Sequence, residues 1–244
     1  MKRYLQAWAM CRSMFCFIPS PWRVWNEEAR PLMLMFLPLL GLEIGAIWWG
    51  AAWLLRNFSI PSAVSALLLC GYPIAVTGAI HLDGFLDVVD AVRSCSAAEK
   101  RREILKDPHV GSFAVIACVF AILAMFSFFS LDNGDIRLLL LIPVVSRCGS
   151  SLAVTLLRPM STSQYAVQSI LKRRAIAPWL MLCAALTAGF LLCGSNGFTL
   201  VIEVAAYGLA LWRGYRALGG MNGDVAGYAL TIAEICGVAA FALI

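Results

Sequence analysis

Long apolar runs separated by short polar turns dominate the chain from about residue 32 onward. Seven such runs can be marked, over residues 32–55, 61–80, 113–131, 137–157, 176–193, 198–212 and 225–244. A helix needs about 20 mostly apolar residues to cross a bilayer, and most of the runs approach that length. The sixth run is short for a full crossing, so we expect it to be tilted or re-entrant. The pattern predicts an all-α, polytopic membrane bundle of about seven transmembrane helices.

The composition supports a membrane environment. Of the 244 residues, 61% are hydrophobic and only 14% are charged, whereas a soluble domain is about half apolar and a quarter charged. The nine cysteines are scattered without a C-x-x-C pair, so we interpret them as small hydrophobic residues. No internal repeat or linker is visible. We expect a single membrane domain over residues 1–244, with an N-terminal cytoplasmic or interfacial segment over residues 1–30.

Positive charges indicate the orientation. If the N-terminus is cytoplasmic and the chain crosses at each run, the lysines and arginines all fall on the cytoplasmic side, except Arg56, Arg137 and Arg147. Positive charge marks the cytoplasmic face of membrane proteins. The same assignment places the longer connections on that face, at residues 81–112, 158–175 and 213–224, and function usually lies on such loops. We therefore expect a multi-pass protein of a bacterial inner membrane, with an active-site loop and helix over residues 81–112 facing the cytoplasm.

The strongest chemical signal is a stripe of aspartates, in the sequence His81-Leu82-Asp83-Gly84-Phe85-Leu86-Asp87-Val88-Val89-Asp90. On a helix, its three aspartates fall within roughly 60° of one another, on one face. Carboxylates this close repel each other, and a bound divalent cation would offset this repulsion. Carboxylate oxygens are ligands that Mg²⁺ prefers. The spacing favours a Mg²⁺ site over a solvated acidic helix face, and Gly84 would let a phosphate approach closely.

Two shorter motifs on the same side carry weaker signals. The first, before the third apolar run, is Lys106-Asp107-Pro108-His109-Val110-Gly111-Ser112. It is compatible with a phosphate cradle and equally with a charged loop that leads into a helix. The second is Gly219-Gly220-Met221-Asn222-Gly223-Asp224. It would add a fourth carboxylate to the metal, although a Gly-rich turn between helices is the simpler interpretation of this motif alone.

Four ionisable residues lie inside apolar runs: Glu43, Arg147, Glu203 and Glu234. Such residues are costly in a membrane and are functional candidates by default. Arg147 is expected either to meet the aspartate stripe or a substrate phosphate, or to form a structural ion pair with one of the three glutamates. The sequence leaves these alternatives open.

Taken in order, the motifs resemble the cobalamin synthase family, the adenosylcobinamide-GDP ribazoletransferases. The aspartate stripe with His81 and Gly84 is similar to the family signature. Further similarity lies in Arg101-Arg102-Glu103-Ile104-Leu105-Lys106-Asp107 with Gly111, in Ser146-Arg147, in Leu218-Gly219-Gly220 with Gly223-Asp224 and Gly227, and in Phe36-Leu37-Pro38-Leu39-Leu40-Gly41. The chain departs from the family pattern at Ala91, at Pro108-His109 and at Asn222.

The resemblance implies a late step of vitamin B12 assembly, in which adenosylcobinamide-GDP condenses with α-ribazole or its 5′-phosphate and GMP is released. It implies a Mg²⁺ cofactor held by Asp83, Asp87 and Asp90, with Asp224 as helper, or one of these carboxylates as general base. Catalytic roles are expected for Asp83, Asp87, Asp90 and Asp107. Substrate contacts are expected from His81, Gly84, Lys106, His109, Gly111, Arg147 and Gly223. The expected partners are the two substrates and the lipid bilayer, without nucleic acid; a homo-oligomer or an association with other B12-assembly enzymes is left open.

Two other functions share some of these features. A CDP-alcohol phosphotransferase would need a glycine after the second aspartate of its D-x-x-D pair and a later D-x-x-x-D, whereas Asp90 is followed by Ala91 and the later acids are missing. An ion-coupled transporter would place acids near the middle of the membrane and repeat its two halves, whereas the stripe follows the end of a run. A purely structural subunit would leave the stripe unexplained. The sequence therefore favours ribazole transfer.

Overall fold

The computed structural model describes residues 2–18, 24–58, 60–131, 133–160 and 172–244. This part of the chain is all-helical and forms no β-strand, as expected for the fold class. The α-helices are α1 (Lys2–Phe15), α2 (Leu37–Asn57), α3 (Ser62–Val76), α4 (Ile80–Arg93), α5 (Ala98–Ile104), α6 (Ser112–Ser130), α7 (Ile142–Leu156), α8 (Ile176–Cys193), α9 (Phe198–Leu218) and α10 (Gly223–Leu243). Short 3-10 helices precede α2 (η1, Arg30–Phe36), α7 (η2, Ile136–Leu140), α8 (η4, Lys172–Ala175) and α9 (η5, Gly194–Gly197).

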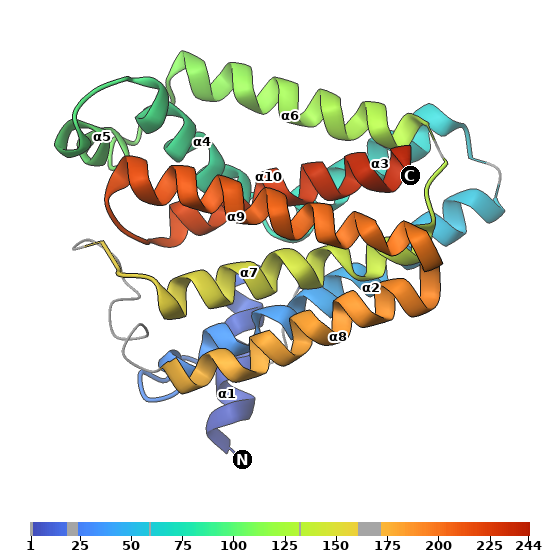
Figure 1. Cartoon of the computed structure of the whole chain (residues 1–244), viewed down its shortest axis with the longest axis horizontal. Helices are drawn as coiled ribbons and strands as arrows, with labels where there is room; N and C mark the ends of the chain where they lie inside the picture. The colour runs from blue at the N-terminus through green and yellow to red at the C-terminus, as the bar shows by residue number, and fades with distance from the viewer. Residues whose placement is uncertain (1, 19–23, 59, 132, 161–171) are drawn as a thin grey trace.

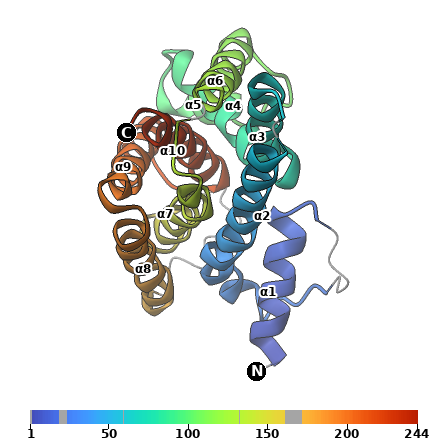
Figure 2. The ribbon, with the colours of Figure 1, turned by 90° about the vertical axis from the view of Figure 1, so that its right-hand side faces the viewer.

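The bundle is arranged around α7. The helices α2, α6, α7, α8, α9 and α10 run along the longest axis of the molecule (Figure 1), and α7 is enclosed by α2, α8, α9 and α10 (Figure 2). All residues of α7 except Gly149 and Leu156 are buried. A helix that is buried on every side belongs to the core of a bundle. The polar side chains of α7 must therefore find their partners inside the protein.

Within the described residues, five apolar helical stretches are long enough to cross a membrane, or six if α3 and α4 count as one bent span. This count does not establish the seven spans expected from the sequence. One of the five stretches, Ile176–Leu218, contains both α8 and α9, which fold back on each other at η5 (Figure 1). The helix of the sixth run is longer than the run itself, because α9 continues through Arg213 and Arg216 and has 21 residues; that this helix is tilted or re-entrant stays a prediction.

The connections lie at two opposite ends of the bundle. The helix α5 and the turn between α9 and α10 lie at one end, and the turn between α8 and α9 lies at the other (Figure 1). Arg56 and Arg137, which the sequence placed on the outer side, meet at the second end. Arg56 donates to the carbonyl of Gly134 at 2.9 Å, and Arg137 pairs with Asp135 at 2.6 Å. This arrangement agrees with the predicted division of the loops between two faces.

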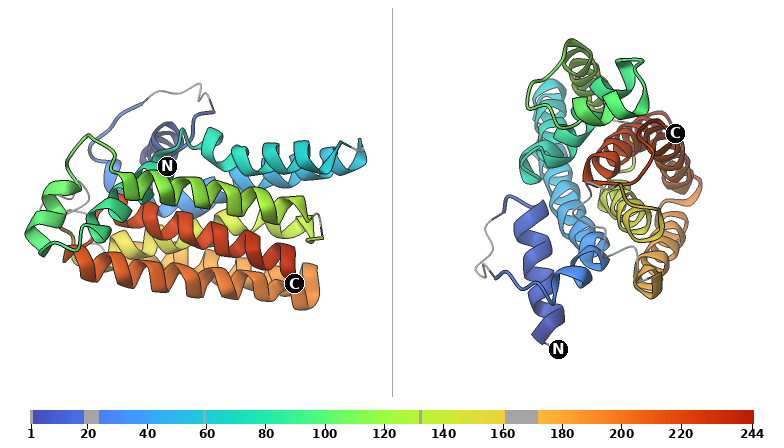
Figure 3. Two further views of the ribbon diagram at one scale, coloured as in Figure 1. Left: turned by 90° about the horizontal axis from the view of Figure 1, so that it is seen from above. Right: turned by 90° about the vertical axis from the view of Figure 1, so that its left-hand side faces the viewer.

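The first helix lies across the bundle rather than along it (Figure 3). Most of its buried residues, including Met10 and Cys11, belong to a core shared with η1 and α2. Arg12 on α1 pairs with Glu43 on α2 at 2.7 Å, so Glu43 is not the partner of Arg147. A helix across the bundle is compatible with the expected interfacial segment, which stays a prediction.

A sharp break separates α3 from α4. Gly78 and Ala79 both adopt left-handed backbone conformations, with φ of +60° and +62°, and α4 leaves at 87° to α3. The left-handed conformation costs an alanine about 1–2 kcal/mol, but a glycine almost nothing. The carbonyl of Val76, freed at the break, accepts the backbone N–H of Phe17 at 2.6 Å. The segment after α1 therefore supports the break that starts the aspartate helix.

Candidate active site

The three aspartates of α4 lie on one side of a regular helix, as the spacing predicted. The opposite side is apolar and packs into the bundle through Phe85, Val88 and other buried residues. Asp83 is exposed, whereas Asp87 and Asp90 are partly buried. The helix thus holds the aspartates at the edge of the core.

Asp224 joins the aspartates of α4 because α4 and α10 pack backbone against backbone. A Cβ atom built on Gly84 would lie only 2.9 Å from the Cα of Asp224, and one on Gly227 would lie 3.0 Å from the carbonyl oxygen of His81. Any side chain at Gly84 would separate the two helices. The structure therefore brings together carboxylates that are about 140 residues apart in the sequence.

The electrostatics of this site centre on Asp87. Partial burial, together with the negative charges of Asp83, Asp224 and Asp90, raises the pKa of Asp87 to about 6. Burial disfavours the charged form of a carboxyl group, and neighbouring carboxylates disfavour it further. The site therefore gathers several carboxylates that repel one another, and a bound cation would reduce that repulsion.

Asp90 has a different set of contacts from the other acids. Its carboxylate accepts the backbone N–H groups of Gly111 and, at 2.9 Å, of Ala114, both at the start of α6. These are N–H groups that a helix start leaves without intrahelical partners. A Cβ atom on Gly111 would lie 2.6 Å from the Asp90 carboxylate, so this contact requires glycine. The N–H of Gly111, expected to bind phosphate, instead holds α4 against α6.

The turn between α9 and α10 is fixed by contacts with two other loops. Gly219 adopts φ of +73° and ends α9. The last carbonyls of α9 accept hydrogen bonds from Arg101 (to Ala217, 3.2 Å) and Arg102 (to Leu218, 2.9 Å). Cations at a helix C-terminus stabilise it. These arginines therefore fix the position of the turn that carries Asp224.

The same turn pairs with the segment that follows α7. The backbone of Met221 bonds with Arg158 and Met160, at 2.9 Å in each case. A Cβ atom on Gly220 would meet the backbone nitrogen of Met160 at 2.9 Å, so this pairing also requires a glycine. Gly219 and Gly220 thus have structural reasons, which is compatible with the interpretation of the motif as a Gly-rich turn.

Asn222 orients Asp224, a role that the sequence analysis missed. The Asn222 side chain accepts the N–H of Val225 at 2.9 Å and so caps α10, while its amide donates to the Asp224 carboxylate at 2.6 Å. Asparagine is a preferred residue at a helix N-cap, so its place before Gly223 and Asp224 was a usable signal. Gly223 is exposed at the first position of α10.

Apart from the Gly111 backbone contact with Asp90, the loop before α6 makes no hydrogen bond or ion pair with the α4 carboxylates in the described part of the chain. Lys106, Asp107 and His109 are all exposed, and His109 Nδ1 lies 2.6 Å from the Asp107 carboxylate. Hydrogen bonds from the backbone and side chain of His109 lower the pKa of Asp107. The predicted catalytic role of Asp107 and the phosphate roles of Lys106 and His109 stay predictions that these contacts do not support.

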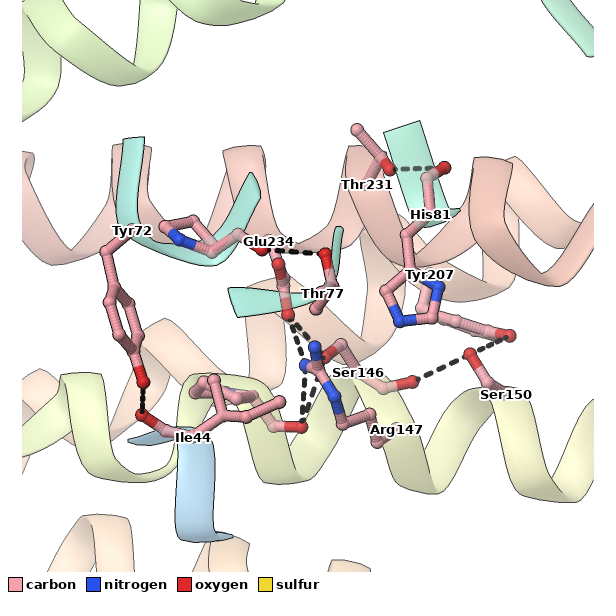
Figure 4. Close-up of polar contacts among 12 residues, drawn as sticks. Ile44, Tyr72, Thr77, His81, Ser146, Arg147, Ser150, Tyr207, Thr231 and Glu234 are labelled. Atoms are coloured by element: carbon pink, nitrogen blue, oxygen red, sulfur yellow. Dashed lines mark hydrogen bonds and ion pairs between the residues drawn. The ribbon is translucent and has the colours of Figure 1, made fainter. Parts of the chain in front are cut away.

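Arg147 forms a buried ion pair with Glu234. Its Nη1 donates to Glu234 at 2.7 Å and to the carbonyl of Pro143 at 3.2 Å, and Ser146 also donates to Glu234 (Figure 4). The arginine side chain is 1% exposed. The structural alternative is therefore the one observed, with Glu234 as partner, and the expected contact with the aspartate stripe is absent from the described residues.

His81 also points away from the aspartates. Its ring stacks on Phe15 of α1 with centroids 6.2 Å apart, and its backbone carbonyl accepts a bond from Thr231 (Figure 4). Its Nε2 is buried and has no hydrogen-bond partner among the described residues. The ring lines the same internal cavity as Arg147 and Glu234. A direct contact of His81 with a diphosphate at the aspartates does not fit this orientation.

The donor set fits Mg²⁺ only in combination with a substrate. The described residues contain no group of three or more His, Cys, Asp or Glu side chains arranged as a ready metal site. Mg²⁺ commonly binds one or two carboxylates and completes its shell with water and substrate phosphates. Asp83, Asp87 and Asp224 offer such oxygens, and their mutual repulsion favours a cation. The Asp90 carboxylate is already engaged by the start of α6.

The comparisons with known proteins agree with the motifs. The family model for cobalamin-5-phosphate synthase matches residues 7–242. An adenosylcobinamide-GDP ribazoletransferase of Clostridium perfringens strain 13 is 34% identical over 98% of each chain. Enzymes of the same name from Lachnoclostridium phytofermentans (30% identical, 96% of this chain and 92% of theirs) and Pseudomonas putida GB-1 (35% identical, 86% and 87%) are also similar. No solved structure matches. The chain therefore belongs to the cobalamin-5-phosphate synthase family.

Proposed function

We propose that this chain condenses adenosylcobinamide-GDP with α-ribazole or its 5′-phosphate and releases GMP. A ribazole hydroxyl attacks the phosphoryl group next to cobinamide, a new phosphodiester bond forms, and the bond to GMP breaks. The observation that carries the proposal is the family match over residues 7–242, together with relatives of that name across 98% of the chain. Phosphoryl transfers of this kind depend mainly on positioning and charge neutralisation.

We assign the diphosphate of the first substrate to the carboxylates at the contact of α4 with α10. Asp83, Asp87 and Asp224 would hold Mg²⁺ there, which supplies charge neutralisation on the diphosphate. The packing at Gly84 supports this assignment, because it joins Asp224 to the α4 carboxylates. Asp90 fixes α4 on α6, and Asn222 orients Asp224, so both are positioning residues in this proposal.

If one of these carboxylates serves as general base instead of holding Mg²⁺, Asp87 is the best candidate to take the proton from the ribazole hydroxyl, which leaves Asp83 and Asp224 to hold the cation. Its pKa of about 6 lies close to neutral pH. At neutral pH such a carboxyl group is largely ionised and still accepts a proton readily. Asp83 is more exposed than Asp87, which suits a ligand of the cation.

The family match and the names of the relatives support ribazole transfer over the other two functions considered. No comparison favours a CDP-alcohol phosphotransferase or an ion-coupled transporter. The carboxylates also gather near one end of the bundle, close to the start of α10. A transporter would instead need them near the middle of the membrane.

The apolar helices indicate a multi-pass membrane protein. We propose that it lies in a bacterial inner membrane with the carboxylates on the cytoplasmic side, and the bias of lysines and arginines supports this orientation. A reporter fused to the C-terminus is then expected on the periplasmic side; a cytoplasmic signal would contradict the orientation. Association with itself or with other B12-assembly enzymes stays a prediction.

The reaction is tested with the detergent-purified chain, adenosylcobinamide-GDP and Mg²⁺, with and without α-ribazole or its 5′-phosphate. The proposal expects GMP and a cobalamin product, identified by mass spectrometry, only when a ribazole substrate is present. GMP release without ribazole would indicate a hydrolase. Transfer of a CDP-alcohol group in a parallel assay would support the lipid enzyme instead.

A further inference from the structure

An apolar groove lies between α4, α6 and α10, with α9 at its margin. Its volume is about 430 Å³. From α6 it is lined by Phe113, Ile116, Ala117 and Phe120, and from α4 and α10 by Phe85, Val89, Val92, Tyr228 and Ile232. The α6 residues recur at the three- and four-residue spacing that places side chains on one face of a helix. Since α6 is one of the stretches able to cross a membrane, the groove is an apolar surface that runs along a membrane helix.

Two arginines without partners stand at the groove. Arg93 is the last residue of α4, and Arg213 lies on α9; both are exposed and both line the groove. Neither has an ion pair or hydrogen bond among the described residues, and both line the groove together with Tyr228. Phe113 is the second residue of α6, so the groove begins near the end of a span and runs inward from there.

The groove is separate from the carboxylate site. At about 100° per residue, Phe85, Val89 and Val92 lie on the side of α4 roughly opposite to Asp83 and Asp87. On α4, the apolar wall of the groove is therefore turned away from the carboxylates that would hold the diphosphate. A second anionic ligand can bind here independently of the proposed reaction.

We propose that this groove binds an anionic phospholipid, with its phosphate on Arg93 and Arg213 and one acyl chain along the α6 face. Basic pockets between membrane helices recognise anionic lipid headgroups, and arginine binds phosphate through paired N–H donors. The apolar walls begin beside the arginines and continue for about 10 Å along α6 from Phe113 to Phe120, at 1.5 Å per residue. The positive charges would thus face the phosphate of a phospholipid, and the apolar walls would face its acyl chain.

Binding is measured by native mass spectrometry of the full chain in detergent, titrated with phosphatidylglycerol or with phosphatidylcholine. We expect tighter binding of phosphatidylglycerol. Each of Arg93→Ala and Arg213→Ala should weaken that binding about fivefold, from the typical worth of a basic residue near an anionic lipid. Arg216→Ala is the matched control, because Arg216 stacks on Trp212 at 5.2 Å and does not line the groove.

A second pair of variants tests the hydrocarbon part. Ala117→Phe should fill the groove and weaken binding of both lipids, whereas Val119→Phe, on an exposed position outside it, should change neither. Glycerol 3-phosphate, which lacks acyl chains, should fail to compete with the lipid. Equal binding of the two lipids, unchanged binding in the Arg93→Ala and Arg213→Ala variants, or competition by glycerol 3-phosphate would each overturn the proposal, whatever the outcome of the GMP assay.

Discussion

Gly84 on α4 lies against Asp224 on α10 so closely that a Cβ atom on the glycine would approach the aspartate Cα to 2.9 Å. This contact joins two motifs from distant parts of the sequence into one acidic site. It explains why the aspartate stripe contains a glycine in its middle.

The first prediction concerns this contact. Gly84→Ala should force α4 and α10 apart, cost about 1–3 kcal/mol in stability and lower the rate of GMP release by about 100-fold, as displacements of about 1 Å at an active site do. Gly50→Ala and Gly71→Ala are matched controls, because a Cβ atom at either helical position meets open space. A Gly84→Ala variant as active as these controls would show that the helix contact does not position the site.

The second prediction separates the roles of Asp90 and Asp83. Asp90→Ala removes an acceptor of two N–H groups at the start of α6 and should cost about 1–2 kcal/mol, visible as a lower melting temperature in detergent. Asp83→Ala should not lower the melting temperature, because the exposed Asp83 side chain makes no hydrogen bond among the described residues and its charge repels Asp87. Equal melting temperatures for the two variants would argue against the capping role of Asp90.

The third prediction follows from the raised pKa of Asp87. Between its ordinary value of 3.8 and the folded value of about 6, the folded protein binds more protons at this group than the unfolded chain. The contribution of Asp87 to stability is therefore present below pH 4 and is lost as the pH rises through about 6. Asp87→Asn should raise the melting temperature at pH 7.5 relative to the parent chain, with the difference vanishing near pH 4. A difference that is the same at both pH values would contradict the assigned cause.

The sequence predicted the helices well and the site in part. The apolar runs define α6, α8 and α10 almost to the residue, because each is a continuous hydrophobic helix that begins after a polar segment. The sequence did not predict the left-handed conformations of Gly78 and Ala79, which bend the chain before α4. Alanine is not a residue typical of that conformation.

The partners of individual side chains were harder to predict than the helices. The spacing of the stripe placed three aspartates on one face, but the neighbours of that face come from α6 and α10. Nothing in the motif itself distinguishes Asp90, which caps α6, from Asp87. Arg147 was left with three possible glutamate partners, because helix packing alone decides that Glu234 on α10 meets it.

The fourth prediction concerns that buried pair. Glu234→Ala should destabilise the protein by about 3–5 kcal/mol, because it leaves the Arg147 charge buried without its partner. The double variant Arg147→Met with Glu234→Met should recover most of that loss, since a buried pair can be replaced by apolar residues of similar size. If the double variant is folded and releases GMP at the parent rate, the role of Arg147 is structural; a folded but inactive protein would return it to the substrate site.

The account rests on the carboxylates at the contact of α4 with α10, and GMP release as a function of Mg²⁺ concentration tests them most directly. The parent chain should be inactive in EDTA and gain activity as Mg²⁺ is added. Asp83→Asn should melt no lower than the parent chain and release no GMP at any Mg²⁺ concentration. Release by the parent chain in EDTA, or release by a folded Asp83→Asn variant at the parent rate, would contradict the proposed role of these aspartates.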